Sequence, residues 1–88
     1  MDTLFLEPAS VTVIYNQTLQ VITGKPVDTP VISPGCPLEV VLHSIFVEYP
    51  QMGKIFPPGK IRILVNRTLP FSMQPLSNGD RIELYGIG

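Results

Sequence analysis

Few side chains in this 88-residue chain have the type and spacing to do chemistry. The single cysteine, Cys36, precedes a stretch that we expect to be helical, and a helix N-terminus can stabilise a thiolate. The simpler interpretation of Cys36 is a small apolar residue near a helix start. The single histidine, His43, has no second histidine or cysteine at metal-ligand spacing, which favours a solvated side chain. No metal or cofactor site is predicted.

Other catalytic patterns are missing from the sequence. The acidic residues are scattered singly, and neither a glycine-rich phosphate loop nor a nucleophile elbow occurs. A self-contained enzyme is therefore not expected. The remaining candidate group is the chain end, where Gly86, Ile87 and Gly88 follow an alternating segment. A short end of small residues is either without function or the part that takes part in chemistry.

Length and composition indicate one soluble domain, residues 1–88, with residues 1–9 as an N-terminal extension and 86–88 as a short C-terminal tail. A net charge of −1 gives no basic excess for a phosphate backbone, so nucleic acid is a poor candidate partner. No apolar stretch is long enough for a membrane span, and the first residues lack the basic start of a signal peptide. We expect a cytoplasmic protein.

Prolines divide the chain into short elements. Alternating, β-branched residues predict strands over Ser10–Tyr15, Lys60–Asn66 and Asp80–Tyr85, the last of these after an Asn78-Gly79 turn. A further extended run covers Val27–Ser33, where Pro30 favours an edge strand. Residues 16–26 are interpreted as polar and turn residues, and Leu69–Phe71 as a short additional segment.

The stretch from Pro37 to Tyr49 is predicted to be a helix although several of its residues favour strands. The helical period places polar residues on one side and apolar residues on the other. Pro37 suits the first position of the helix, and Pro50 ends it. The apolar side consists of Leu38, Val41, Leu42, Ile45, Phe46 and Tyr49.

One helix covers only one face of a small sheet, which predicts an α+β architecture with the other face open to water. The open face carries either Thr12, Ile14, Arg62 and Leu64 or Val11, Val13, Ile61 and Ile63. Both sets contain large apolar residues, so this face is a candidate surface for a partner.

Four stretches resemble the ubiquitin-like β-grasp sulfur carriers, namely the small subunit of molybdopterin synthase and the sulfur carrier of the thiamine pathway. The stretches are VTVIYNQTLQVITGK, VISPGCPLEVVLHSIFVEYPQM, IRILVNRTL and LSNGDRIEL, which together span nearly the whole chain from Val11 to Leu84. Their order and spacing carry the resemblance. It implies a mixed four- to five-stranded sheet with one helix packed on one face.

The resemblance also implies a function for the chain end. In that family a tail ending in Gly-Gly is adenylated by an E1-like enzyme using ATP and becomes a thiocarboxylate, which donates sulfur inside a partner's active site. By position, Gly88 would provide the C-terminal carboxylate, and Gly86 and Ile87 would present it. A terminal glycine has no Cβ and can enter a narrow channel. The implied partners are an E1-like adenylating enzyme and a synthase large subunit.

Two other functions stay open. Ile87 stands where the family has glycine, and only three residues follow Tyr85, which suits a non-catalytic β-grasp interaction module with an inert tail. In that case Gly86 ends the strand and Ile87 packs back or frays. The third candidate is a small enzyme built around Cys36 and His43, which predicts a reactive thiol.

Overall fold

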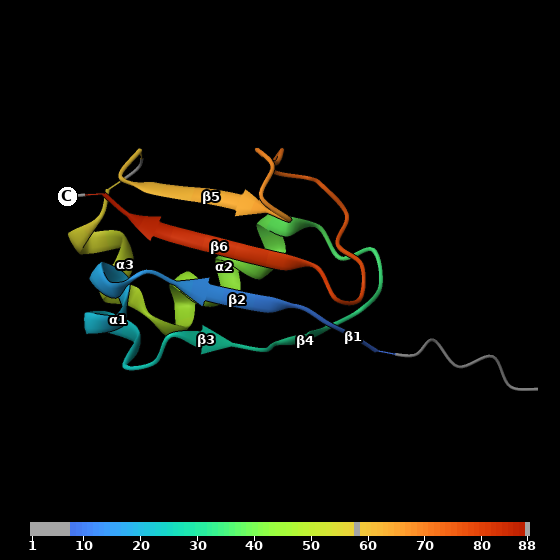
Figure 1. Ribbon diagram of the computed structural model, residues 1–88, viewed down its shortest axis with the longest axis horizontal. Coiled ribbons are helices and arrows are strands. Elements are labelled where there is room, and N and C mark those ends of the chain that lie inside the picture. Colours follow the sequence, from blue (N-terminus) through green and yellow to red (C-terminus); the bar gives the residue numbers. More distant parts are fainter. Residues whose placement is uncertain (1–7, 58, 88) are drawn as a thin grey trace, which may run out of the picture.

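The computed structural model describes residues 8–57 and 59–87. A four-stranded sheet forms one layer, and helices cover one of its faces (Figure 1). The strands of this sheet are β2 (Thr12–Tyr15), β3 (Val27–Asp28), β5 (Ile61–Val65) and β6 (Arg81–Gly86). Their order is β3-β2-β6-β5, so β3 and β5 are the two edges.

The sheet is mixed. The strand β2 runs parallel to β6, whereas β3 pairs with β2 and β5 pairs with β6 in the antiparallel sense. A parallel pair requires a crossover between its strands, and the helices in the chain between β2 and β6 provide it. The predicted α+β class with a mixed sheet is confirmed.

The main helix is α2 (Leu38–Glu48), as the periodicity predicts. Leu38, Val41 and Ile45 are buried, while Glu39 and His43 are exposed. Pro37 adopts an extended conformation as the N-cap, one position before the one we expected. Pro50 ends α2 and begins α3 (Pro50–Ile55), where we expected a loop, because proline fits the first turn of a helix.

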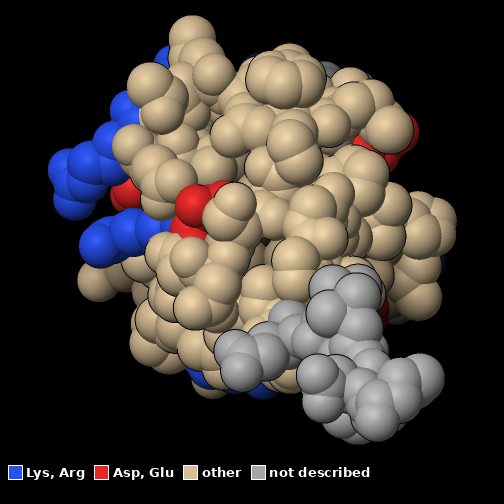
Figure 2. All heavy atoms as spheres, turned by 90° about the vertical axis from the view of Figure 1, so that its right-hand side faces the viewer, with Lys and Arg blue, Asp and Glu red and all other residues tan. Residues whose placement is uncertain are grey.

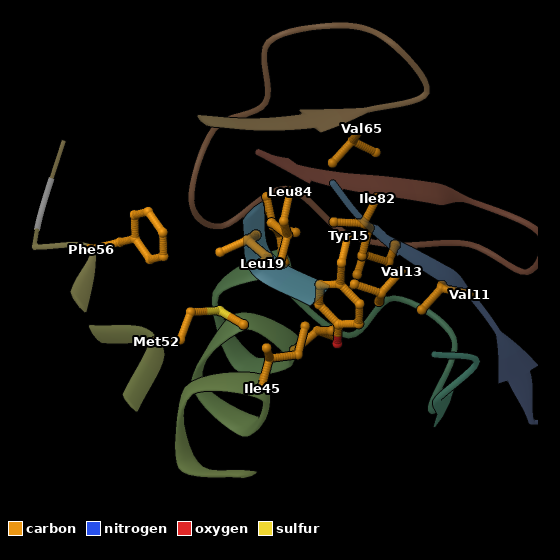
Figure 3. Packing of buried hydrophobic residues seen from close by; sticks show 13 residues of the cluster. Val11, Val13, Tyr15, Leu19, Ile45, Met52, Phe56, Val65, Ile82 and Leu84 are labelled. Carbon is orange, nitrogen blue, oxygen red and sulfur yellow. The ribbon is translucent and has the colours of Figure 1, made fainter. Parts of the chain in front are cut away.

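The core lies between the sheet and the helices (Figure 3). Burial of these apolar side chains is the main favourable contribution to folding. The buried core residues are Val11, Val13, Tyr15, Leu19, Leu38, Val41, Ile45, Met52, Phe56, Val65, Leu76, Ile82 and Leu84.

A third helix, α1 (Gln17–Thr23), replaces the turn region that we expected after β2. Asn16 caps its first turn by accepting a hydrogen bond from the N–H of Leu19. Gly24 ends it at a φ of 73°, in the left-handed region that favours glycine. Both caps are visible in the sequence, but a seven-residue helix is too short for a clear apolar period.

The expected strand over Val27–Ser33 is divided at Thr29-Pro30. Its first half is β3, and its second half is β4 (Val31–Ile32), which pairs with β1 (Ala9–Ser10) in a separate two-stranded sheet. Proline cannot donate to a ladder, so the pairing breaks at Pro30. The edge position of β3 is as predicted. Pro8 and Ala9 of the N-terminal extension are described, and residues 1–7 lie outside the described part.

The predicted short segment Leu69–Phe71 is wrong, because these residues form no strand. They belong to the connection between β5 and β6, which leaves Leu69, Phe71 and Met73 largely exposed. Pro70 removes one donor in this segment, and Thr68 folds back to pair with Val65.

Candidate functional site

The C-terminal end of β6 is fixed to the fold by the side chain of Asn16. Asn16 Oδ1 accepts a hydrogen bond from the N–H of Gly86 at 3.2 Å, and Asn16 Nδ2 donates to the carbonyl of Gly86 at 3.2 Å. The N–H of Ile87 donates to the carbonyl of Lys60 at 2.7 Å. The same Asn16 side chain caps α1, so one residue joins the start of a helix to the end of the last strand.

Gly86 occupies a crowded position. A Cβ at this residue would lie 2.9 Å from Leu19 Cδ2 and 2.9 Å from Phe56 Cε1, which is closer than real contacts allow. A larger residue here would require Leu19 or Phe56 to shift, so glycine lets the strand pass over these two side chains without displacing them. Gly86 is the last residue of β6 and is buried, one position beyond the strand end that we predicted.

The three proposed tail residues differ in their surroundings. Gly86 lies within the sheet, and Ile87 is 44% exposed beside it. Gly88 lies outside the described residues. The described part of the tail is thus held by the Asn16 side chain and by the backbone hydrogen bond from Ile87 to Lys60. Neither Asn16 nor the crowding at Gly86 was anticipated from the sequence.

The structure shows which strand residues lie on the open face of the sheet. Val11 and Val13 are buried on the helix side, so the set with Thr12, Ile14, Arg62 and Leu64 faces away from the helices. Residues of β6 complete this face, because Glu83 is paired with both Ile14 and Leu64, and Tyr85 with Arg62.

Glu83 is a buried carboxylate at the centre of the open face. Its Oε2 accepts a hydrogen bond from the Tyr85 hydroxyl, and this bond raises the pKa of Tyr85. Its Oε1 has no hydrogen-bond partner among the described residues. The nearest cations are Arg81 Nε at 3.8 Å and Arg67 Nε at 3.9 Å, both at ion-pair distance.

All three arginines of the chain, Arg62, Arg67 and Arg81, belong to this face. Figure 2 shows basic side chains gathered along one margin of the molecule, with few charges elsewhere on the visible face. The strand alternation places Glu83 outward, but the sequence could not show that neighbours on β2 and β5 bury it. Apolar Ile14 and Leu64 flank Glu83 on this face, and such a mixture of apolar and charged side chains suits a protein surface of complementary character.

Several solved structures share this arrangement. A protein named as molybdopterin converting factor, subunit 1, from Pyrococcus furiosus superposes with a TM-score of 0.78 at 16% identity, covering 91% of this chain and 99% of that chain. Small archaeal modifier protein 1 from H. volcanii gives 0.77 at 14% identity, covering 91% and 99%. The fold is the ubiquitin-like β-grasp.

A third structure with the β-grasp fold is small archaeal modifier protein 1 from Methanosarcina acetivorans. It gives a TM-score of 0.73 at 23% identity and covers 92% of this chain and 95% of that chain. Neither a protein-family model nor the sequence of a curated protein matches this chain. At these identities the likeness establishes the β-grasp fold alone.

Within this β-grasp fold, Cys36 and His43 do not form a common site. Cys36 is partly buried against the core, and its Sγ lies 3.7 Å from the carbonyl of Pro37. His43 is on the exposed side of α2. Among residues 8–57 and 59–87, no group of three or more His, Cys, Asp or Glu side chains is placed to hold a metal ion. The same residues include no helix long and apolar enough to span a membrane.

Proposed function

We propose that this chain is a ubiquitin-like carrier that presents the carboxylate of Gly88 to partner enzymes. An E1-like enzyme would use ATP to adenylate this carboxylate, and a sulfur donor would then replace the adenylate to give a thiocarboxylate. A synthase large subunit would take the sulfur for molybdopterin or a related cofactor. ATP is used by the partner, and the carrier itself needs no bound cofactor.

The observation that carries the proposal is the β-grasp fold with β6 as its last strand, leading directly to Gly88. A protein with the same fold is named as a molybdopterin converting factor subunit. Ile87, the last described residue, is held beside the sheet by its hydrogen bond to the carbonyl of Lys60. The partner's catalytic centre would therefore have to come close to this end of the sheet, or Ile87 would have to leave Lys60.

The open face is the surface on which we place the partner enzyme. Ile14 and Leu64 provide apolar contact area beside Glu83, and the three arginines form a basic margin. Two of the structures with this fold are named modifiers, which suggests a second fate for the activated Gly88, namely transfer to an amine of another protein.

A second candidate is a non-catalytic interaction module. It is favoured by the bonds that hold Gly86 and Ile87 in the sheet, because a carrier needs a free end. In this case the open face binds a partner and the chain end is inert.

Intact-mass spectrometry separates the two candidates. The protein is incubated with ATP, a sulfur source and an E1-like enzyme from its own host, beside a carrier known to react. A carrier gains about 16 Da, the exchange of one oxygen for sulfur, and fragmentation assigns the change to Gly88. A variant without Gly88 gains nothing. An unchanged mass, with the control carrier modified in the same mixture, contradicts the carrier function and leaves the interaction module.

A further inference from the structure

The outer edge of β5 is the longest unpaired strand edge in the described sheet. Its five residues, Ile61–Val65, pair with β6, only Val65 has a described partner on the other side, and Figure 1 shows β5 as the outermost strand. Unpaired edges are templates for another extended chain. The question is which chain this edge would accept.

Two hydrogen bonds fix which backbone groups face outward. The N–H of Asn66 donates to the carbonyl of Arg81 at 2.8 Å, and that of Ile87 donates to the carbonyl of Lys60 at 2.7 Å. Hydrogen-bonded pairs alternate along an antiparallel ladder, so the N–H and C=O groups of Ile61 and Ile63 point away from β6. No described residue outside the strand ladder bonds to them. Val65 is already paired with Thr68.

An apolar groove runs beside this edge on the helix side. Seven residues line it and none is charged. The edge residues Ile61 and Ile63 line it together with Phe46 and Phe56. A second extended chain paired with β5 would direct every other side chain into this groove.

The other face of the edge is basic. From Tyr49 to Gly79 the chain has four basic residues, Lys54, Lys60, Arg62 and Arg67, and no acidic residue. Strand alternation places Lys60 and Arg62 on the open face, opposite to Ile61 and Ile63. Side chains of an added strand that do not enter the groove would lie beside these two cations.

We propose that the β5 edge binds an extended segment of a partner protein in which aliphatic residues alternate with Asp or Glu. The segment forms up to four backbone hydrogen bonds, with the N–H and C=O groups of Ile61 and Ile63. Its aliphatic side chains fill the groove, and its carboxylates lie beside Lys60 and Arg62. A second copy of this chain is a poor occupant, because its own β5 would bring like charges together. The site does not involve Gly88, so it is independent of the proposed carrier function.

The probe is a capped peptide of about seven residues in which Glu alternates with Val and Ile, enough to span β5. One control has the same composition with the Glu residues in a block, and the other has Lys in place of Glu. Amide NMR spectra of the whole protein are recorded during titration with each peptide. We expect only the alternating Glu peptide to bind strongly, with the largest changes at β5 and slowed hydrogen exchange at Ile61 and Ile63.

Two variants test the geometry and the charge separately. Ile61→Pro removes an outward N–H without removing a bond to β6, and we expect about tenfold weaker binding. Its matched control, Ile61→Val, keeps the donor and should bind within about twofold of the native chain. Arg62→Glu should weaken binding of the Glu peptide several-fold and strengthen binding of the Lys peptide. Amide spectra of the free variants establish that each is folded.

Three results would overturn the proposal. The first is no binding of the alternating peptide up to millimolar concentration. The second is binding that Ile61→Pro and Arg62→Glu both leave unchanged, or that shifts only residues of the open face. The third is a concentration-dependent dimer, seen by sedimentation, that protects the Ile61 and Ile63 amides and would make a second copy the occupant.

Discussion

The two edges of the four-stranded sheet are built in opposite ways. The edge strand β3 has only two residues, and its Asp28 makes several polar contacts. Asp28 Oδ2 accepts hydrogen bonds from the hydroxyls of Tyr15 at 2.7 Å and Tyr49 at 2.9 Å. Asp28 Oδ1 lies 2.7 Å from Lys25 Nζ. The edge strand β5 has five residues, and no described residue outside the ladder engages the outward backbone groups of Ile61 and Ile63. One edge is short and is held to the rest of the fold by side-chain contacts, whereas the other is longer and leaves the outward groups of Ile61 and Ile63 without a described partner.

The contacts at Asp28 hold the β3 edge to the rest of the fold. Desolvation raises the pKa of Asp28, but the hydrogen bonds from Lys25, Tyr15 and Tyr49 outweigh it, and the pKa is lowered overall. Burial raises the pKa of Tyr15, and the bond to Asp28 adds to this. The rings of Tyr15 and Tyr49 meet edge to face at 6.0 Å, so the network also ties the sheet edge to the end of α2. This difference between edges lies in side-chain contacts rather than in strand propensity.

Removing the Asp28 side chain should have the largest effect on stability. We expect Asp28→Ala to lower the free energy of unfolding by about 2–3 kcal/mol, because Tyr15 loses the acceptor of its hydroxyl. Tyr15 as a whole residue is only 1% exposed. The matched change at the other edge, Arg62→Ala, should stay within about 0.5 kcal/mol. Urea unfolding of both variants at neutral pH measures the difference.

A double variant checks the cause. Tyr15→Phe combined with Asp28→Ala removes both the donor and the acceptor, and should recover part of the lost stability. Equal losses for Asp28→Ala and Arg62→Ala would show that the two edges do not differ as described.

A substitution at Gly86 tests how tightly the end of β6 is packed against the core. Replacing a strand glycine by alanine favours folding by about 0.4–1 kcal/mol through the unfolded chain, whereas overpacking costs about 1–3 kcal/mol. Since a Cβ would lie 2.9 Å from both Leu19 and Phe56, we expect crowding to dominate, with a net loss of about 1–2 kcal/mol for Gly86→Ala. Thermal or urea unfolding measures it. A neutral or stabilising result would show that the end of β6 is packed loosely against Leu19 and Phe56.

Much of this fold follows from the sequence. The β-branched alternation predicts β2, β5 and β6, and the helical period of Leu38, Val41 and Ile45 predicts α2, because these patterns report which face is buried. The short helices α1 and α3 were missed, since each is too short to show a period and depends on local caps. Pro30 correctly indicated an edge, but not that the strand would be divided between two sheets.

The candidate site was less predictable. The hydrogen bonds of Asn16 to Gly86 join residues 70 positions apart, and no local pattern reports such a contact. Burial of Glu83 depends on the register of β2 and β5 against β6, which hydrophobic alternation does not specify along an open face. Predicting which residues lie on the open face requires the same register. Local propensity can be predicted from the sequence, whereas the long-range register of the strands cannot.

The smallest expected effect is the pH dependence of the stability that Asp28 provides at the β3 edge. A carboxyl whose pKa is lower in the folded than in the unfolded protein adds stability above its unfolded pKa of about 4, and this is lost as the pH falls through the folded pKa. The stability difference between the native chain and Asp28→Asn should therefore be largest near neutral pH and shrink below about pH 4. Urea unfolding between acid and neutral pH measures it. Arg62→Ala is the control at the β5 edge, and its difference should not change over this range, because this substitution leaves every carboxyl group in place. A constant difference for Asp28→Asn would mean that Asp28 holds the β3 edge to the fold by shape and hydrogen bonding alone, without a contribution from its charge.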